Sequence, residues 1–341
     1  MKKFLLISML IMLATGIAFA AGRGQDSSAA SDGRLLSAPL TFRVTYPDTA
    51  TTDLNIRMTE AYNKITQLTN GELRFEIFHS GQLGSIPDYL EQMRAGAPIF
   101  CSAGFGNVGD IVPFLMPGEA PYLFYEADEV FKLGRSTWFA NAKQEMIKAG
   151  IQPIAVGTAG FRHMLSRRPI YDASSIAGMR IRMGASGMAQ GFVRVMGGAP
   201  VTSNWPDVYS MLQQGVIDAT DSAIIGLWDA SLAEVTSYLT LTGHFATPLM
   251  MMTSTSNWAK IPAPYQKIIE DCITEAYMQV YEDTLIKEGP VLQQFKDAGV
   301  QVLETDKSTF SAYVPRLLQE LGYSPSVYDE MRRAIETAPA R

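Results

Sequence analysis

The chain has 341 residues, of which 47% are hydrophobic and 18% are charged, and its formal net charge is −6. This composition is typical of a globular protein, and the roughly 300 residues beyond the N-terminal region suggest two domains. The acidic balance argues against a nucleic-acid partner, which needs clustered Lys and Arg, and means that an anionic ligand would have to be bound by local positive charge.

The N-terminus has the features of a secretory signal peptide. Lys2 and Lys3 precede an apolar run over residues 4–20, which closes on a small-x-small pattern at Ala20. The alternative is a membrane anchor, but the run is at the short end of the roughly 17–25 residues that span a bilayer, and no stop-transfer charges follow. We therefore expect residues 1–20 to be cleaved near Ala20 and the mature protein to be periplasmic.

The next segment, residues 21–38, is rich in Gly, Ser and other small polar residues. It cannot bury enough apolar surface to order itself, so we predict a flexible leader, with the folded part beginning near Pro39. No cysteine lies near the cleavage site to carry a lipid.

From Pro39 onwards, strand-like and helical patterns alternate. The expected strands are 40–46, 73–78, 98–103, 151–158, 161–166, 179–183, 217–220, 238–241, 247–253 and 300–303. The expected helices are 51–69, 86–94, 128–149, 186–196, 207–214 and 264–298, followed by a helical C-terminus. We expect 104–121 to be irregular and Gly289-Pro290 to kink or break the last helix. The alternation indicates α/β domains with largely parallel sheets.

Cys101 and Cys272 are the two cysteines of the chain. In an oxidising compartment they could form a disulfide, and the plainer interpretation is that both are small buried hydrophobic side chains. No cysteine spacing matches a zinc site, so no metal is expected.

A glycine motif at 104–109 (GFGNVG) matches G-x-G-x-x-G after a predicted strand. A dinucleotide site would need a helix whose N-terminus faces the pyrophosphate, and Pro113 and Pro117 follow too soon for a long helix. We interpret the motif as a turn that lines a cleft, and expect no cofactor.

Little in the sequence points to catalysis. There is no G-x-S-x-G motif, and the three histidines, His79, His163 and His244, are each expected to be structural hydrogen-bonding residues rather than bases. A Ser-His-Asp triad is defined by geometry, so the sequence leaves one open without indicating it. We expect no enzyme and no catalytic residues.

Two arginines lie in or beside predicted strands among apolar neighbours. Arg162 begins one strand, and strand alternation places Arg180 and Arg182 on one face of another. A guanidinium in such a place needs a partner, and its planar fork matches a carboxylate. That carboxylate belongs either to a ligand or to an internal Asp or Glu, and the pattern does not decide between them.

Trp205 lies in a loop between Pro200 and Pro206. It either forms the floor of a ligand pocket or fills the edge of a domain, and its position alone favours neither strongly.

Several segments follow one another in an order that is specific to one family. They are Thr69-Asn70-Gly71, Gln82-Leu83-Gly84, Pro121-Tyr122-Leu123-Phe124, Gly160-Phe161-Arg162-His163, Arg168-Pro169-Ile170, Gly178-Met179-Arg180-Ile181-Arg182 and the stretch from Pro200 to Asp218. Together they resemble the DctP-type solute-binding proteins of TRAP (tripartite ATP-independent periplasmic) transporters, over residues 40–320.

The resemblance implies an α/β, two-lobed periplasmic-binding-protein-like fold (Venus flytrap) with a long helix crossing both lobes. One lobe would comprise 39–158 with about 243–260. The second would comprise 159–242 with about 261–341, including the long linking helix.

The resemblance also implies ligand-binding residues. Arg182 occupies the place of the arginine that forms a bidentate salt bridge with the ligand carboxylate, and Arg162 that of a second positive contact. Trp205 occupies the place of an aromatic residue that contacts the ligand.

Three further positions complete the expected site. Ser222 stands where the family usually has an Asn that hydrogen-bonds the carboxylate, and its shorter side chain without an amide puts the ligand pose in doubt. Tyr46 and Phe105 are expected ligand contacts of the N-terminal lobe, because one follows a strand and the other lies in the expected cleft loop.

The implied function is that of a periplasmic, monomeric solute-binding protein of a TRAP transporter. It would bind a small organic acid (a C4-dicarboxylate, a sugar acid or a similar carboxylate) and deliver it to the small and large integral membrane subunits. The alternatives are the ligand-binding component of a periplasmic sensor system and a periplasmic hydrolase, whose nucleophile-base pair the sequence does not display.

Overall fold

The computed structural model describes residues 34–339, so the predicted signal peptide and most of the predicted leader lie outside the described residues. The last leader residues have defined contacts. The amide N–H groups of Leu35 and Leu36 donate to the Glu72 carboxylate at 3.0 and 2.7 Å, and the Tyr265 hydroxyl donates to the same group at 2.9 Å. Leu35 and Leu36, which precede the predicted start of the folded part at Pro39, are therefore held by the Glu72 carboxylate, which accepts from their backbone.

Eleven strands form two sheets within the described chain. The first sheet contains β1 (Leu40–Thr45), β2 (Leu73–Phe78), β3 (Ile99–Gly104), β4 (Ile151–Thr158) and β10 (Pro248–Ser254). The second contains β5 (Arg162–Ser166), β6 (Arg180–Met183), β7 (Ala199–Thr202), β8 (Ala219–Ala223), β9 (Tyr238–Phe245) and β11 (Gln301–Leu303).

The strand order is β2-β1-β3-β10-β4 in the first sheet and β11-β9-β5-β8-β6-β7 in the second. Parallel pairing joins β1 to β2 and β3, and β6 to β7 and β8. By contrast, β10 and β5 are antiparallel to both of their neighbours. Both sheets are therefore mixed rather than largely parallel. The cause is that β5 and β10 enter their sheets directly from a strand of the other sheet, without a crossover helix to reverse the chain.

The α-helices of the described residues are α1 (Asp53–Leu68), α2 (Ile86–Arg94), α3 (Phe105–Gly109), α4 (Glu129–Arg135), α5 (Thr137–Lys148), α6 (Gly187–Val195), α7 (Val208–Gln213), α8 (Ile224–Asp229), α9 (Thr255–Trp258), α10 (Ala263–Asp297), α11 (Lys307–Ser311), α12 (Val314–Glu320) and α13 (Ser326–Glu336). The 3₁₀ helices are η1 (Pro113–Glu119), η2 (Ala173–Ile176), η3 (Trp205–Asp207) and η4 (Leu232–Glu234). Among these helices, none combines the length and apolarity needed to cross a membrane.

Two predictions of local structure within residues 104–149 were wrong. The single helix expected over 128–149 is divided at Ser136, whose hydroxyl donates to the Leu133 carbonyl at 2.7 Å and accepts from the Phe139 N–H at 3.1 Å. Ser136 thus closes α4 and caps the start of α5, and hydrophobic spacing cannot reveal a one-residue division. The stretch 104–121, expected to be irregular, contains α3 and η1.

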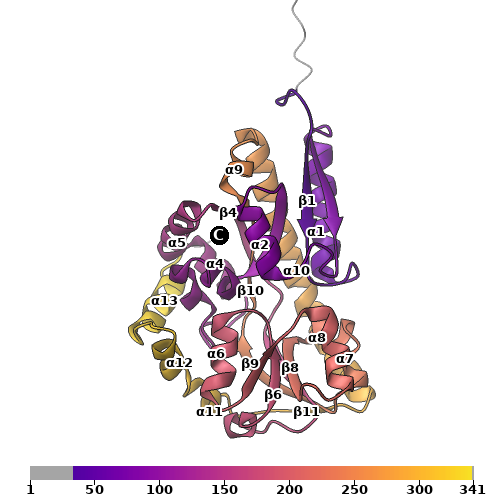
Figure 1. Ribbon diagram of the computed structural model, residues 1–341, viewed down its shortest axis with the longest axis vertical. Coiled ribbons are helices and arrows are strands. Elements are labelled where there is room, and N and C mark those ends of the chain that lie inside the picture. The colour runs from indigo at the N-terminus through magenta and orange to yellow at the C-terminus, as the bar shows by residue number, and fades with distance from the viewer. Residues whose placement is uncertain (1–33, 340–341) are drawn as a thin grey trace, which may run out of the picture. The chain divides into compact units, whose positions relative to one another are not determined.

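The long helix α10 spans Ala263–Asp297 without interruption, although Pro290 lies inside it. Of the kink or break predicted at Gly289-Pro290, the break is therefore wrong, because a proline removes only one hydrogen bond and neighbouring turns are held by buried residues such as Val291 and Phe295. The kink stays a prediction. In Figure 1, α10 (orange) runs from beside α1 to α8. It packs against helix α1 and strand β4 of the first sheet at one end, and against helix α8 and strand β11 of the second sheet at the other. One helix thus connects the two sheets.

Cys101 and Cys272 are both buried and free. They belong to different hydrophobic clusters, one that includes Met93 and one that includes Tyr277. The interpretation as buried apolar side chains is therefore confirmed over the disulfide.

The lobe boundaries expected from the sequence stay a prediction. Strand β9, of the second sheet, extends to Phe245 and so crosses the boundary expected near residue 243, and the last helix also departs from the expected division. Although residues 261–341 were assigned to the second lobe, α13 packs against α4, α5 and η1, and the buried Arg332 on α13 forms an ion pair with Glu129 on α4 at 2.7 Å. The C-terminal helices therefore reach elements of both proposed lobes.

A glycine allows α10 to approach the first sheet closely. A Cβ atom at Gly157 on β4 would overlap the ring of Tyr277, whose hydroxyl pairs with Ser102 Oγ at 2.9 Å. Tyr277 is fully buried. The helix therefore packs on the sheet only because position 157 has no side chain.

We predict that Gly157→Ala lowers the free energy of unfolding by about 1–3 kcal/mol, because the added methyl group must displace Tyr277 in a packed core. Urea unfolding followed by circular dichroism would measure this. The control is Gly289→Ala on α10, where nothing lies within 4 Å of the new Cβ. That change should be neutral or stabilising by up to about 1 kcal/mol. Equal stability of Gly157→Ala and the native chain would contradict the close-packing argument.

Candidate functional site

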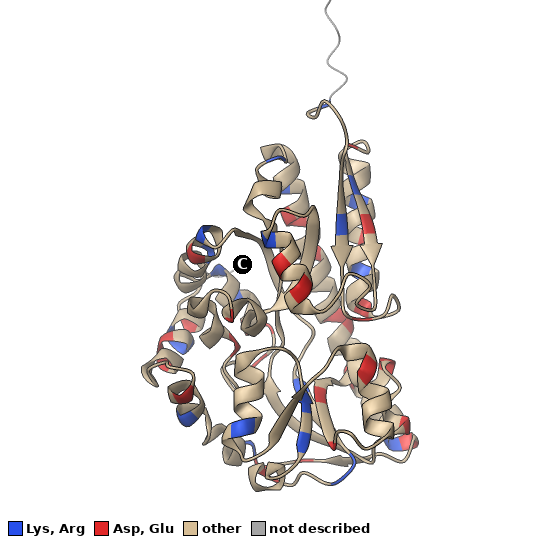
Figure 2. Ribbon diagram, viewed as in Figure 1, with Lys and Arg blue, Asp and Glu red and all other residues tan. Residues whose placement is uncertain are grey.

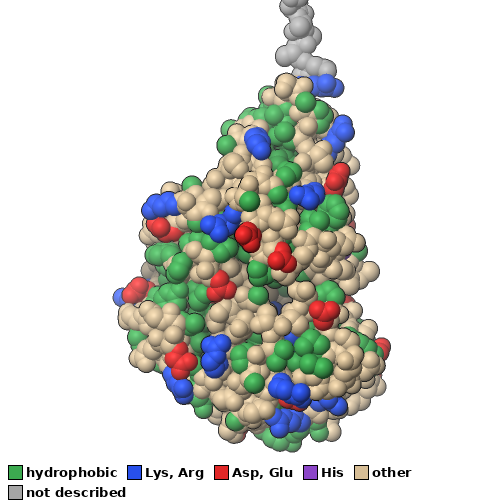
Figure 3. Space-filling model, in the orientation of Figure 1, with side chains coloured by type: hydrophobic (Ala, Val, Ile, Leu, Met, Phe, Trp, Pro, Cys, Tyr) green, Lys and Arg blue, Asp and Glu red, His purple; other side chains and the backbone are tan. Residues whose placement is uncertain are grey.

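A cavity of about 930 Å³ lies where strand ends of the two sheets meet. The parallel strands contribute the residues at or just beyond their carboxyl ends, as at Asp48 after β1 and Ser203 after β7, and the antiparallel strands contribute their amino ends, as at Pro248 and Arg162. Such an edge suits ligand binding, because the loop side chains and backbone groups there are not used in hydrogen bonds between strands. Figure 3 shows a recess on this face with Lys or Arg atoms inside it.

Arg162 forms an internal ion pair at the wall of this cavity. Its Nε donates to Asp221 Oδ2 at 2.6 Å and its Nη2 to Oδ1 at 2.8 Å. Arg162 pairs with Ala223 across the β5–β8 ladder, so Asp221, two residues back on the same face, meets it diagonally. The sequence left open whether Arg162 pairs with a ligand or with an internal carboxylate, and the structure contains an internal partner, Asp221. The Nη1 of Arg162 donates to no described residue.

Asp221 is fully buried and has a second donor, His244 Nε2, at 3.1 Å. Burial raises the pKa of Asp221, but the charge and hydrogen bonds of Arg162 and the hydrogen bond of His244 outweigh burial and hold the pKa well below its usual range. Burial lowers the pKa of His244, so its ring is neutral at neutral pH, and Nδ1 pairs with Thr242 Oγ1 at 2.8 Å. The carboxylate is thus fixed on two sides and stays ionised.

The histidines occupy structural positions. His163 accepts from the Gly243 N–H through Nδ1 at 3.1 Å, and burial lowers its pKa to about 3. His244 orients Asp221, as described above. Burial also lowers the pKa of His79, whose ring stacks on Tyr46 with centroids 6.4 Å apart.

Arg182 differs from Arg162 because no described Asp or Glu lies within ion-pair distance of it. Its Nε and Nη2 both donate to the Ser203 carbonyl oxygen, at 3.2 and 2.8 Å. The residue is only 6% exposed. Burial lowers its pKa to about 10, with Asp221 opposing this effect and Arg162 adding to it. Arg182 is therefore a buried cation that lines the cavity without a carboxylate partner.

The position of Arg182 on its strand explains this difference from Arg180. Both lie on β6, which Figure 2 shows with basic residues along it. Arg180, at the start of the strand, is exposed and forms an ion pair with Asp218 at 2.9 Å. Arg182 lies near the carboxyl end, where the ladder ends and the cavity begins.

Trp205 lies both at the cavity and against a hydrophobic core, and its contact with a ligand stays a prediction. Its ring centroid lies 5.3 Å from Cζ of Arg182, a cation–π distance, and the side chain lines the cavity. The same side chain packs against the hydrophobic cluster around Leu212. Trp205 thus fills the edge of a core and holds Arg182 at the cavity wall.

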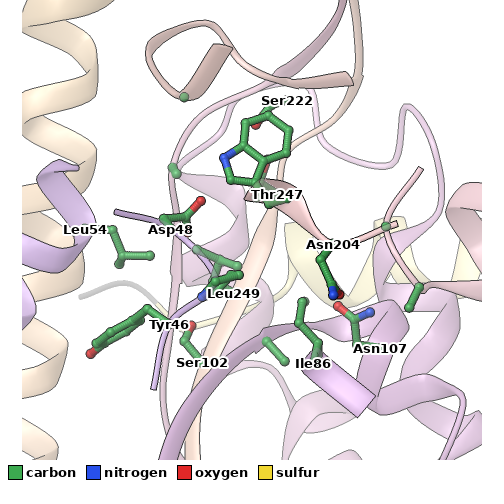
Figure 4. Close-up of a pocket in the computed structure, with 18 of the residues that line it drawn as sticks. Tyr46, Asp48, Leu54, Ile86, Ser102, Asn107, Asn204, Ser222, Thr247 and Leu249 are labelled. Carbon is green, nitrogen blue, oxygen red and sulfur yellow. The ribbon is translucent and has the colours of Figure 1, made fainter. Parts of the chain in front are cut away.

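The remaining predicted residues differ in position. Ser222 and Tyr46 line the cavity, although Figure 4 shows the Tyr46 hydroxyl pointing away from its centre. Phe105 does not line it. This side chain is fully buried and stacks on Phe139, with centroids 5.8 Å apart, so its prediction as a ligand contact is corrected. As the first residue of α3, it faces the core rather than the cleft.

The glycine motif forms a cavity wall, as expected, but as a short helix rather than a turn. Gly104 and Asn107 line the cavity, and the Gly106 N–H donates to the Glu119 carboxylate. A Cβ at Gly106 would overlap Glu119 and Ser186. The glycine therefore allows α3, η1 and α6 to meet closely, and α3 with its five residues is too short to present a dinucleotide site.

Sequence reasoning did not assign any of the acidic cavity residues to the site, and burial raises the pKa of two of them, Asp48 and Glu119. Asp48 follows β1, and Figure 4 shows its carboxylate extending into the cavity. Burial raises its pKa to about 6 against the opposing charges of Arg162 and Arg182. Glu119 ends η1, and burial raises its pKa to about 7 despite the Gly106 hydrogen bond. The only sequence indication was the position of Asp48 directly after a strand.

No group of three or more His, Cys, Asp or Glu side chains in the described chain is arranged to hold a metal ion. The site thus combines one paired arginine, one unpaired arginine and an aromatic wall with several acidic side chains, among them Asp48 and Glu119.

Comparison with known families agrees with this architecture. The family model for bacterial extracellular solute-binding protein, family 7 (DctP) matches residues 51–323. The chain belongs to this family, whose members serve as periplasmic substrate-binding proteins of TRAP transporters. The resemblance drawn from the sequence is confirmed.

Individual relatives bind different acids. The chain is 25% identical over 269 residues to the 2,3-diketo-L-gulonate-binding periplasmic protein YiaO of Escherichia coli, covering 77% of this chain and 81% of that protein. A TRAP periplasmic solute-binding protein of Actinobacillus succinogenes with bound L-galactonate superposes with a TM-score of 0.83 at 28% identity, over 87% of this chain and 99% of the other. One from Desulfovibrio salexigens, complexed with diglycerolphosphate, gives 0.83 at 26%, over 87% and 97%. The two-lobed fold predicted from the sequence is thereby confirmed.

We predict that Asp221→Asn lowers the free energy of unfolding by about 3–5 kcal/mol, because the half-buried Arg162 would lose the counter-ion that lies fully buried beside it. Chemical denaturation of the ligand-free protein would measure it. Asp218→Asn, which removes the half-buried partner of the exposed Arg180, is the matched control and should change stability by less than about 1 kcal/mol. A small, equal effect of both changes would show that the Asp221 ion pair is not needed for stability.

The raised pKa of Asp48 predicts a pH dependence. Folding favours the protonated carboxyl, so the folded state binds more protons than the unfolded state between the unfolded pKa near 3.8 and the folded value of about 6. The stability of the native chain relative to Asp48→Asn should therefore rise as pH falls through this window. The comparison with the variant cancels the opposite contribution of His163 and His244. Thermal unfolding of both proteins from pH 7 to pH 4 measures it, and a constant difference would contradict the prediction.

Proposed function

We propose that this protein is the periplasmic, monomeric solute-binding protein of a TRAP transporter, and that it captures a small organic acid whose carboxylate pairs with Arg182 and Arg162. The family membership supports the transport role, and the relatives that bind sugar acids support the ligand class. The arginine contact and the ligand itself are our inference from the cavity.

The observation that carries the proposal is the unpaired Arg182. A buried cation with only a carbonyl acceptor costs free energy, and an anion that enters the cavity removes this cost. The planar guanidinium would offer a carboxylate charge-assisted hydrogen bonds in a region of low effective dielectric. The Nη1 of Arg162, which has no partner among the described residues, supplies a second donor.

The connections between the sheets suit capture by closure. Residues 159–161 join β4 to β5, residues 246–247 join β9 to β10, and α10 packs near both sheets. Short strand-to-strand connections of this kind can absorb backbone rotation while each sheet moves as a unit. In the proposed cycle, the ligand bridges the two sheets, and the closed form delivers it to the small and large membrane subunits.

We predict that Arg182→Ala weakens binding of the preferred acid at least about 30-fold, in line with the 2–5 kcal/mol typical of a buried hydrogen-bonded charge pair. Thermal unfolding against a panel of organic acids would reveal the ligand, because a thousandfold excess over Kd stabilises the folded state by about 4 kcal/mol. Isothermal titration calorimetry would then give the affinities.

The control for this experiment is Arg180→Ala, two residues away on β6 and exposed outside the cavity. It should bind as the native protein does. The protein is first unfolded and refolded to remove any ligand acquired during expression. If Arg182→Ala retains the native affinity for every acid that binds, the arginine-carboxylate proposal is wrong.

A further inference from the structure

The cavity contains more negative than positive charge. Its basic lining residues are Arg162 and Arg182 alone among the described residues. Its acidic lining residues are Asp48, Asp53, Asp88, Glu119, Asp207 and Asp229. Because Asp221 already compensates Arg162, the lining as a whole disfavours a ligand with two full negative charges.

Some of these acidic side chains already interact with other residues of the protein. Asp53 forms an ion pair with Lys287, and Asp88 closes the capping box of α2 with Ser85. By contrast, the Asp48 carboxylate has no side-chain partner among the described residues. It remains available to a ligand.

The loop that carries Asp48 is held in place by its backbone. The Asp48 carbonyl accepts from Asn55 Nδ2 at 3.1 Å and from the Ser80 N–H at 2.8 Å, and the Tyr46 carbonyl accepts from the Gly81 N–H at 3.1 Å. The carboxylate is therefore preorganised at the end of β1, opposite the arginines of the second sheet.

Glu119 is positioned in a similar way. It accepts from the Gly106 N–H and from Ser186 Oγ at 3.3 Å, which fixes its orientation and leaves lone pairs unused. The same cavity is lined by uncharged polar side chains, among them Asn107 and Asn204, which point toward one another in Figure 4. Burial raises the pKa of the Asp48 and Glu119 carboxyl groups, which favours ligand groups that share a proton with them.

We propose that the cavity selects a polyhydroxy monocarboxylate, whose single carboxylate lies on the arginines and whose hydroxyl groups donate to Asp48 and Glu119. This proposal rests on the function proposed above and makes it more specific. A carboxylate side chain accepts hydroxyl hydrogen bonds well, whereas it repels a second carboxylate or a phosphate dianion. The hydroxyl and amide groups of Ser102, Asn107 and Asn204 supply further partners.

An acid that carries an ammonium group is the alternative ligand whose charges would also match those of the cavity. Its cation would pair with Asp48 or Glu119 as a hydroxyl would. The abundance of neutral hydroxyl and amide groups in the lining favours hydroxyls, because each such group must be satisfied when the closed cavity excludes water. The ammonium acid is therefore one outcome of the test.

The test measures Kd by calorimetry for refolded, ligand-free protein with L-galactonate, L-fuconate, hexanoate, succinate, glycerol 3-phosphate and 6-aminohexanoate. The variants are Asp48→Asn and Glu119→Gln, which keep the side-chain shape. Glu91→Gln, an exposed position on α2 outside the cavity lining, is the control. Circular dichroism confirms folding, and Asp48→Ala and Glu119→Ala replace any variant that fails to fold.

The native protein should bind a sugar acid at least tenfold more tightly than hexanoate, succinate, glycerol 3-phosphate or 6-aminohexanoate. Asp48→Asn and Glu119→Gln should each weaken sugar-acid binding about tenfold or more, reduce the preference over hexanoate, and leave or improve succinate binding. Glu91→Gln should match the native protein. The change in preference between hydroxylated and unhydroxylated acids separates a direct contact from a general loss of structure.

Tighter native binding of succinate, glycerol 3-phosphate or 6-aminohexanoate would overturn this inference, as would variants with unchanged preference. These results leave the arginine proposal intact if Arg182→Ala still abolishes acid binding. Retention of acid binding by Arg182→Ala would instead refute the proposed function on which the inference rests. The two failures are therefore distinguishable.

Discussion

The buried carboxylate of Asp221 determines how the two cavity arginines differ. It takes two hydrogen bonds from the side chain of Arg162 and a third from His244, and it forms no hydrogen bond with Arg182. One arginine is therefore a fixed part of the protein, and the other is a cation held by the Ser203 carbonyl and the Trp205 ring. The proposed ligand carboxylate takes the place of the missing counter-ion.

Strand direction explains why charges of opposite sign face one cavity. Each sheet places the carboxyl ends of its parallel strands at the same edge, so the first sheet contributes Asp48 and the second contributes Arg182. A ligand with an anionic end and hydrogen-bond donors would contact both sheets. In the proposed cycle its binding free energy would favour the arrangement in which the sheets approach each other.

Burial patterns explain which elements were predictable. Strands β2 and β4 and helix α2 have the predicted bounds, because their apolar residues repeat with the period of the element that buries them. The division at Ser136 and the continuity of α10 through Pro290 depend on single hydrogen bonds and on tertiary packing. Neither feature changes the periodic spacing of apolar residues in the sequence. Phe105 was misplaced for a related reason, since a residue next to a cleft can still face the core.

The sequence by itself determined the family, the α/β class, the buried free cysteines as the plainer interpretation, and the arginines as the residues to examine. The order of the motifs and the spacing of apolar residues are properties of the sequence, so they can be recognised from the sequence alone. Only the tertiary structure decided that Arg162 is paired while Arg182 is not, and that Asp48 and Glu119 lie in the same cavity. These facts depend on contacts between residues far apart in the chain, such as Arg162 with Asp221, and the free energy of a buried charge is set by such contacts rather than by local sequence.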